Sequence, residues 1–296
     1  MVCILNNINS NNQKLLDRYL MICKNKGLTE RSIDAFRIDL LLYLRFLGDK
    51  ELKDTNHIDV EDFLYYCQTE RKNQDCTLDR KCTSLNSFYK TLIKKDYLDV
   101  KNPMDKIDPI KVRKKVRDYL TEEEYNNVIT YLEKTNDLRG QALIHLMYSS
   151  ACRISEIIQL NRDTLDFEKR RFKVKGKGDK ERICMFSEQA KEKILQYLGS
   201  RNDNLEPLFL SREHKRWSKR SIQRYVRSLM KKLGITKHIT PHSFRHSVLT
   251  HMRLHGESIE NLQLLAGHSS IQTTQQTYTH VGLDDVSDKF DKFFNR

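Results

Sequence analysis

The sequence predicts a mainly α-helical protein with a small β-sheet, divided between two domains. Its 296 residues are enough for two domains of about 100 to 200 residues each. The chain contains only 10 glycines and 4 prolines, so few positions interrupt regular structure and helices should dominate. Because β-sandwiches and barrels need many turns, neither is expected here.

The first hundred residues are expected to form an all-α domain of four or five helices. Apolar residues at helical spacing mark two of them. These residues are Ile33, Phe36, Leu40, Leu44 and Leu47 in the first helix, and Leu85, Phe88, Tyr89, Leu92 and Ile93 in the second. Further helices are expected near residues 12–25 and 58–70. The sequence of this part contains no catalytic constellation.

A basic linker is expected to follow the first domain. Residues 102–120 contain Pro103 and Pro109 and show little periodicity, which is typical of an extended segment. We place the boundary near residue 113, with an N-terminal domain over residues 1–112 and a second domain over residues 113–296. Basic residues near this boundary are expected to follow a phosphate backbone. They include Lys111, Arg113, Lys114 and Lys115.

Local signals predict the elements of the second domain. Thr121 followed by Glu124 has the pattern of a capping box that begins a helix, and a largely apolar helix should cover residues 138–148. Residues 170–175 and 182–186 flank a turn at 176–179 and should pair as a β-hairpin. A basic helix is expected over 218–233. Thr240 and Pro241 should begin a further helix that ends near Leu254.

The positive charge of the chain is concentrated in two segments. The net charge is +13; residues 168–182 hold eight basic and three acidic side chains, and residues 212–232 hold nine basic and one acidic. The two segments account for the whole excess, which favours a docking surface for a polyanion over a uniformly solvated basic surface. Nucleic acid is the first candidate partner and an anionic membrane the second. On the 218–233 helix, the expected DNA contacts are Lys219, Arg220 and Arg224.

Composition also bears on the cellular compartment. No window approaches the ~18 apolar residues of a membrane-spanning helix, and the residues after Met1 lack the pattern of a signal peptide. The seven cysteines are odd in number, scattered and without a C-x-x-C pair, so neither a disulfide framework nor a zinc site is expected. We therefore expect a cytoplasmic protein without a membrane partner.

One predicted helix carries a polar constellation. His242, Arg245 and His246 should share one face, presented to a cleft or to solvent, opposite an apolar stripe that includes Phe244 and Val248. A metal site at the two histidines is disfavoured, because the glutamate of the H-E-x-x-H motif is absent and Arg245 would repel a cation. The glycines around Lys177 do not match a phosphate-binding P-loop either. No cofactor is expected.

Five motifs together resemble the tyrosine recombinase/integrase family. They are ACRISEI (151–157), KVKGKGDKER (173–182), HSFRH (242–246), AGHSS (266–270) and TYTHV (277–281), and they occur in the order found in that family. The length and the helical first domain are most similar to Xer-type and transposon-encoded members with two domains. The resemblance implies an α-helical core-binding domain followed by a mixed α/β catalytic domain. It also implies cleavage and rejoining of DNA strands without metal or ATP.

The resemblance assigns a nucleophile and two phosphate ligands. Tyr278 matches the residue that attacks the scissile phosphate, giving a 3′-phosphotyrosine and a free 5′-hydroxyl. Arg153 and Arg245 match the two arginines that bind the nonbridging oxygens as negative charge builds. Glu156 is a ready ion-pair partner for Arg153 and could orient it.

The remaining roles fall to a lysine and two histidines. Lys177 matches the lysine that protonates the departing 5′-oxygen, with Lys175 and Lys180 as close competitors. His242 matches the histidine that assists proton transfer at the tyrosine. His268 matches the position that hydrogen-bonds the phosphate.

Two further features bear on the biological role. Tyr278 follows His268 by ten residues, one more than is usual in Xer-like members, which slightly favours a mobile element over chromosome-dimer resolution. An amphipathic terminal segment with Val286, Phe290, Phe293 and Phe294 needs a partner surface. The resemblance implies a homotetramer that exchanges strands through a Holliday junction on double-stranded DNA with specific sites, with this tail docked on a neighbour. Docking on its own domain in a free monomer, and the participation of accessory proteins, stay open.

Three rival functions are kept. Xer-type resolution of chromosome or plasmid dimers would use the same chemistry for another task. A type IB topoisomerase would share the phosphotyrosine step and relax supercoils. A non-catalytic sequence-specific DNA-binding protein would retain the basic segments, but it would have no need of Tyr278 in register with Arg153 and Arg245. The expected location of any of these is the bacterial cytoplasm, in association with the nucleoid.

Overall fold

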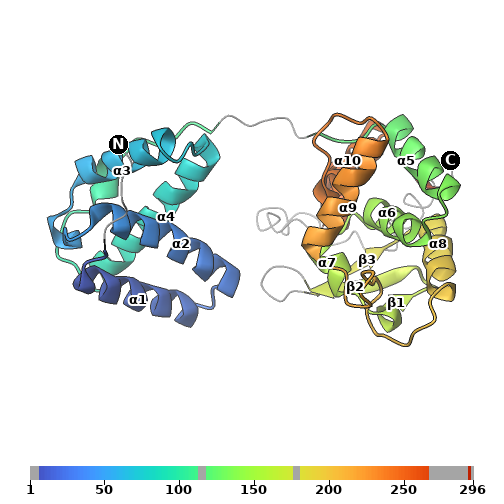
Figure 1. The fold of residues 1–296 in the computed structure, drawn as a ribbon, viewed down its shortest axis with the longest axis horizontal. Coiled ribbons are helices and arrows are strands. Elements are labelled where there is room, and N and C mark those ends of the chain that lie inside the picture. The colour runs from blue at the N-terminus through green and yellow to red at the C-terminus, as the bar shows by residue number, and fades with distance from the viewer. Residues whose placement is uncertain (1–6, 113–117, 176–180, 267–292, 295–296) are drawn as a thin grey trace. The chain divides into compact units, whose positions relative to one another are not determined.

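Two compact units, Met1–Lys115 and Val116–Arg296, make up the chain (Figure 1). The computed structural model describes residues 7–112, 118–175, 181–266 and 293–294. Helices dominate both units, and a small sheet occurs in the second, so the predicted fold class is confirmed. Within the described residues, no helix combines the length and apolar character that crossing a bilayer requires.

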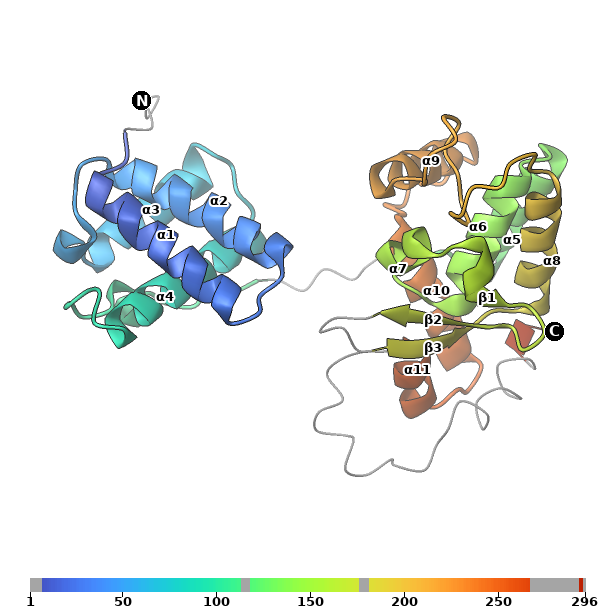
Figure 2. The same cartoon turned by 90° about the horizontal axis from the view of Figure 1, so that it is seen from below.

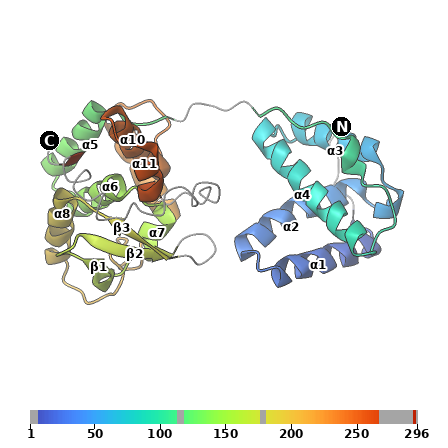
Figure 3. The ribbon, with the colours of Figure 1, turned by 180° about the vertical axis from the view of Figure 1, so that it is seen from behind.

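The first unit is built from helices that surround one core. Its described α-helices are α1 (Ser10–Asn25), α2 (Glu30–Leu47), α3 (His57–Thr69) and α4 (Asp75–Lys94). α1 packs along α2, and α4 contacts the other three (Figure 3). The apolar stripe predicted on α2 faces this core, because Ile33, Leu40 and Leu44 are fully buried. The largest buried side chains are Tyr19, Tyr43, Phe63, Phe88 and Tyr89.

Residues 103–106, expected within an extended linker, instead form a 3-10 helix, η2 (Pro103–Lys106). Asn102 Oδ1 caps it by accepting a hydrogen bond from the Met104 backbone N–H at 3.1 Å. η2 packs against α3 and α4, which buries Pro103 and Met104. The two prolines suggested a linker, but the apolar surface of the bundle draws this segment into the first unit.

A buried carboxylate that the hydrophobic pattern did not predict lies on α2. Asp39 is 1% exposed and accepts hydrogen bonds from Lys81 Nζ at 3.0 Å and from Ser84 Oγ at 2.9 Å. Arg80 also donates to the carboxylate. These α4 groups compensate a charge that would otherwise be costly to bury, so they fix α2 against α4.

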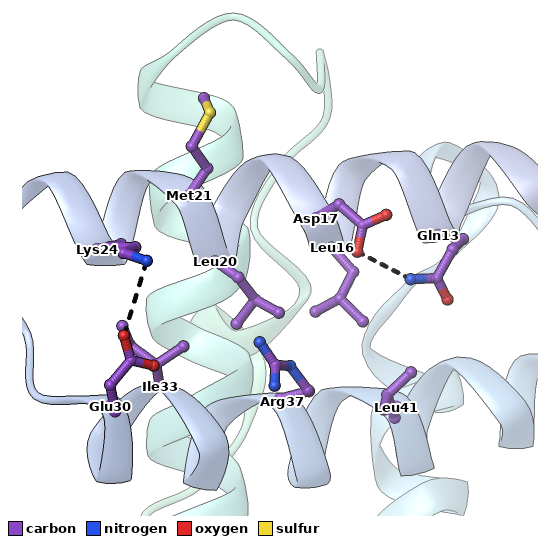
Figure 4. Close-up of a pocket in the computed structure, with 10 residues that line it drawn as sticks. All are labelled: Gln13, Leu16, Asp17, Leu20, Met21, Lys24, Glu30, Ile33, Arg37 and Leu41. Carbon is purple, nitrogen blue, oxygen red and sulfur yellow. Dashed lines mark hydrogen bonds and ion pairs between the residues drawn. The ribbon is translucent and has the colours of Figure 1, made fainter.

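A groove of about 490 Å³ lies between α1 and α2 (Figure 4). Leu16, Leu20 and Ile33 supply its apolar lining, and Arg37 extends from α2 into the space between the helices (Figure 4). Lys24 Nζ lies 3.8 Å from Glu30 Oε1 at one end. None of the site residues predicted from the sequence lines this groove.

The second unit is arranged around α6 (Leu138–Ser150), which is apolar on most of its surface and almost entirely buried. It contacts α5 (Glu122–Lys134), α8 (Glu188–Gly199) and α10 (Pro241–Leu254) (Figure 1). The predicted capping box begins α5: Thr121 N donates to Glu124 Oε2 at 2.8 Å, and Glu124 N donates to Thr121 Oγ1 at 3.1 Å. The helix predicted from Pro241 to Leu254 is confirmed.

The sheet has three antiparallel strands in the order β1-β2-β3 (Figure 2). They are β1 (Leu165–Asp166), β2 (Arg171–Lys175) and β3 (Glu181–Met185). Phe172 pairs with Leu165 on one side and with Cys184 on the other, and all three face the core. The two strands of the predicted hairpin are confirmed. β1 was not expected, because two residues are too few to show alternation.

Three further α-helices lie in the described part of this unit: α7 (Ile154–Gln159), α9 (Lys219–Lys232) and α11 (Ile259–Ala266). α9 confirms the predicted basic helix, and Ile222, Val226 and Leu229 bury its apolar face. α7, α8 and α11 were not predicted. α7 has only six residues, so its position depends on contacts with neighbouring elements.

Phe293 and Phe294, near the C-terminus, pack on their own unit. Gln189 Nε2 donates to the Phe294 carbonyl oxygen at 2.9 Å. The Phe294 ring lies edge-on to Tyr148 with centroids 6.0 Å apart, and the Phe293 ring lies 5.6 Å from that of His255. Docking on the same chain, left open by the sequence, is therefore observed for these two residues. Val286 and Phe290 lie outside the described residues.

The pH dependence of stability should report on His145 in α6. Burial, and then the charge of Lys193, lower its pKa from 6.5 to about 4. Between these values the unfolded chain binds the extra proton, so the free energy of unfolding should fall as the pH drops. Between pH 7.5 and pH 5 this group should contribute a loss of about 2 kcal/mol.

Chemical denaturation of the wild type and of His145→Phe across this range measures the effect. The variant keeps an aromatic ring but cannot titrate, so it should lose about 2 kcal/mol less than the wild type on acidification. Equal losses in both proteins would contradict the assignment.

Candidate active site

The connection from α6 to α7 places Arg153. Ala151 ends α6 in the left-handed conformation, with φ of 48°, and turns the chain so that α7 begins three residues later. Arg153 occupies the N-cap position of α7, and its side chain is 31% exposed. Glu156, three residues further on, accepts hydrogen bonds from the Arg153 backbone N–H at 2.7 Å and from Arg153 Nη1 at 3.0 Å.

Arg245 reaches the same connection from α10. Its Nη1 donates to the carbonyl oxygen of Ala151 at 2.5 Å, a contact between residues 94 positions apart in the chain. The structure therefore brings together the two predicted phosphate ligands, Arg153 and Arg245. Arg245 is only 6% exposed, although it was expected on a face open to a cleft or to solvent. The long guanidinium side chain lies across the end of α6 instead of extending outward.

A third arginine completes the group. Arg182 on β3 donates to both carboxylate oxygens of Glu156, from Nη1 at 2.7 Å and from Nη2 at 2.9 Å. Its Nη2 also lies 3.8 Å from the Sγ atom of Cys152, next to Arg153 in the chain. Burial opposes ionisation of Glu156, but the hydrogen bonds from Arg182 and Arg153 prevail and lower its pKa.

Positive charge exceeds negative charge in this group. The arginine cluster, which we define as Arg153, Arg182, Arg245 and Glu156, holds three guanidinium groups and one carboxylate. Burial, followed by repulsion from Arg153 and Arg182, lowers the pKa of Arg245 to about 10, so it stays protonated at neutral pH. The four side chains of the cluster therefore have a formal net charge of +2, which suits an anion with oxygens that accept paired hydrogen bonds.

The histidines of α10 lie on the same helix as Arg245. His242 is exposed in the first turn, three residues before Arg245, so both lie on one side of the helix. His246 is half-buried, and its ring lies edge-on to Tyr119 with centroids 5.8 Å apart. On the opposite side, Phe244 and Val248 are fully buried, as the sequence predicted.

Several predicted residues lie outside the described residues. Among the catalytic candidates these are Lys177, His268 and Tyr278. Among the DNA-binding candidates they are Arg113, Lys114 and Lys115. Lys111 is described and exposed, in the first unit.

The basic helix α9 presents a polar face to solvent. Arg220 and Arg224 are exposed, whereas Lys219 in the first turn is half-buried. Arg224 Nη2 donates to Ser221 Oγ at 3.3 Å, one turn earlier on the same helix. Such a row of exposed cations is suited to a phosphate backbone.

Arg182 is the site residue that the sequence analysis did not single out. The motif at residues 173–182 points to the lysines around the turn, and it includes Arg182 only as one of several basic residues. Alternation along β3 could have placed it on the same buried face as Cys184, but its partner Glu156 is 26 residues away. No local signal connects the two.

Comparison with models of known protein families shows the family to which the chain belongs. Residues 118–283 match the model of the phage integrase family, and residues 15–99 match that of the phage integrase N-terminal SAM-like domain. The chain belongs to the phage integrase family. The resemblance to tyrosine recombinases and integrases predicted from the five motifs is therefore confirmed.

Individual relatives agree with this assignment. The tyrosine recombinase XerC of Leptospira interrogans is 30% identical over 283 residues, which cover 93% of this chain and 90% of the relative. The Tn1549 transposon integrase bound to transposon right end DNA has a TM-score of 0.73 and 20% identity, covering 93% of this chain and 98% of the other. A λ integrase tetramer bound to a Holliday junction gives a TM-score of 0.71 and 17% identity, covering 89% of this chain and 80% of the other.

Stability should depend on the single carboxylate of the arginine cluster. Glu156→Gln removes the charge that compensates two half-buried arginines, so the free energy of unfolding should fall by about 3 kcal/mol. Sulfate should restore part of this loss by supplying negative charge to the cluster, more than chloride at equal ionic strength.

Denaturant titrations in both salts test this expectation. Glu213→Gln, an exposed residue on a loop before α9, serves as the control and should change stability by less than about 0.5 kcal/mol. A Glu156→Gln protein as stable as this control would show that the cluster does not need the carboxylate.

Proposed function

We propose that the chain is a site-specific DNA recombinase that cleaves and rejoins DNA through a 3′-phosphotyrosine intermediate. One observation carries the proposal: Arg153 and Arg245, from separate helices, meet at the end of α6 in a cluster with excess positive charge. Family membership supplies the reaction, since the chain is a member of the tyrosine recombinases, which transfer DNA strands.

The arginines would act on the phosphorus centre. A scissile phosphate placed at the cluster would receive paired hydrogen bonds on its nonbridging oxygens, which stabilise the additional charge of a pentacoordinate transition state. Tyr278 would attack phosphorus, forming the Tyr O–P bond while the P–O5′ bond breaks. The energy of the phosphodiester is kept in the phosphotyrosine, and attack by a 5′-hydroxyl reverses the step.

Three further residues would assist the reaction, two of them by transferring protons. Lys177 would protonate the departing 5′-oxygen, and His242 would assist removal of the proton from Tyr278. His268 would hydrogen-bond the phosphate. The exposed position of His242, three residues before Arg245 on α10, supports its assignment to the same reaction centre. None of these steps requires a metal ion or ATP.

The proposed partner is double-stranded DNA with specific recombination sites. The exposed basic face of α9 supports this partner, and the solved relatives include an integrase on transposon DNA and an integrase tetramer on a Holliday junction. We infer a homotetramer on DNA, in which the segment around Phe294 leaves its own unit and docks on a neighbour. The proposed location is the bacterial cytoplasm, with the nucleoid.

Two biological roles share this chemistry. The spacing between His268 and Tyr278 favours integration, excision or resolution of a mobile element. Likeness to XerC and XerD over more than nine-tenths of the chain favours resolution of chromosome or plasmid dimers. An assay that compares two kinds of substrate separates the two roles. Recombination between two sites of the host chromosome supports dimer resolution, whereas recombination between the two ends of an element supports the mobile-element role.

Covalent trapping tests the proposed reaction. Because the target sequence has to be found first, wild-type protein is used to select a bound duplex from a random-sequence library. The selected duplex is then nicked near its centre, so that the short 5′-hydroxyl strand diffuses away after cleavage and the adduct accumulates. Wild type should give a denaturation-resistant adduct, and Tyr278→Phe should bind equally well and give none.

Conservative arginine changes sharpen the same assay. Arg153→Lys and Arg245→Lys keep the charge but lose the planar pair of donors, so cleavage should slow by about 100-fold or more. Binding of the duplex by wild type without any adduct would instead support the non-catalytic DNA-binding protein. An adduct that survives Tyr278→Phe would place the nucleophile elsewhere.

Salt dependence tests the basic surfaces. Each of Arg220→Gln and Arg224→Gln should reduce the slope of log K against log salt concentration by about 0.9, the value for one phosphate contact. Lys134→Gln, at the exposed end of α5, is the charge-matched control and should leave the slope unchanged. A slope that is equal in all three variants would exclude α9 from the DNA interface.

A further inference from the structure

Arg182 donates hydrogen bonds to the Glu156 carboxylate, which also accepts hydrogen bonds from Arg153. The Oε1 atom of Glu156 accepts from Nη1 of both arginines, and Oε2 accepts from Arg182 Nη2 and from the Arg153 backbone N–H. Each carboxylate oxygen is thus shared between the residue that begins α7 and the strand β3. The side chains of Arg182 and Glu156 are only 16% and 5% exposed, so water competes little for these bonds.

The position of α7 depends on this contact. α7 has six residues, far fewer than an isolated helix needs to be stable, so its orientation must be set by tertiary contacts. Arg182 makes two charge-assisted hydrogen bonds to Glu156 in the first turn of α7, which fixes that turn against β3. Arg153, at the N-cap, moves with the same turn.

We propose that Arg182 is a positioning residue for DNA cleavage, which acts through Glu156 to orient Arg153 toward the scissile phosphate. This inference rests on the proposed recombinase function. Arg182 need not touch the substrate. Loss of Arg182 should therefore lower the rate of cleavage at saturating protein and leave the affinity for DNA unchanged.

Single-turnover cleavage of the nicked duplex described above measures the effect. Arg182→Met should bind within about threefold of wild type and cleave roughly 10- to 100-fold more slowly, the range expected for a displacement of about 1 Å at a reacting group. Arg182→Lys, which keeps the charge and one donor direction, should fall between the two. The double variant Arg182→Met/Glu156→Gln should be slowed by less than the product of the two single effects, because both changes remove the bonds between Arg182 and Glu156.

Arg201→Met is the matched control. Arg201 is also a largely buried arginine of this unit, with Nη2 at 2.5 Å from Asp203 Oδ1, but it lies outside the arginine cluster. Its variant should lose stability and cleave at the wild-type rate when both are measured well below the unfolding temperature. Equal rates for Arg182→Met and Arg201→Met would overturn the proposal, as would a defect of Arg182→Met confined to DNA affinity.

Hydrogen exchange supplies a readout that does not need activity. In the free protein, Arg182→Met should raise exchange of the backbone amides of residues 153–157 at least tenfold, whereas Arg201→Met should not. Unchanged protection there would overturn the proposal even if the wild type cleaves DNA. A wild type that forms no adduct would count against the recombinase function alone, and the exchange result would still decide whether Arg182 fixes α7.

Discussion

A buried carboxylate shared by two arginines organises the second unit of this protein. Glu156 joins the short helix α7 to the strand β3 through Arg182, and it fixes Arg153 by both its backbone and its side chain. The same turn of chain presents the Ala151 carbonyl oxygen to Arg245. The cluster sets one acidic group against three cations, and this formal excess of positive charge suits a phosphate ligand.

The surrounding helices support this arrangement by burying α6, the helix whose C-terminal end adjoins the arginine cluster. α6 is held by α5, α8 and α10, so the turn that ends it has little freedom to move. Burial beside like charges is unfavourable for Arg245. Such strain is expected at a binding site, where a ligand of opposite charge relieves it. The first unit has its own core and its own buried ion pair at Asp39, and it contributes no residue to the cluster.

Local signals in the sequence predicted what depends on local structure. The capping pattern at Thr121 and the proline after Thr240 marked helix starts correctly, and the motifs pointed to Arg153 and Arg245. Features that depend on packing were missed or misjudged: Pro103 is drawn into the first core, β1 is too short to show a pattern, and Arg245 is buried. The link from Arg182 to Glu156 spans two elements and could not be read from either alone.

A crystal structure of the chain on a duplex that carries the scissile phosphate would test the central claim most directly. We expect guanidinium nitrogens of Arg153 and Arg245 within about 3 Å of the nonbridging oxygens, with Glu156 still bound by Arg182. A phosphate bound elsewhere on the second unit, or a Glu156 released from Arg182 to contact other groups, would contradict the account.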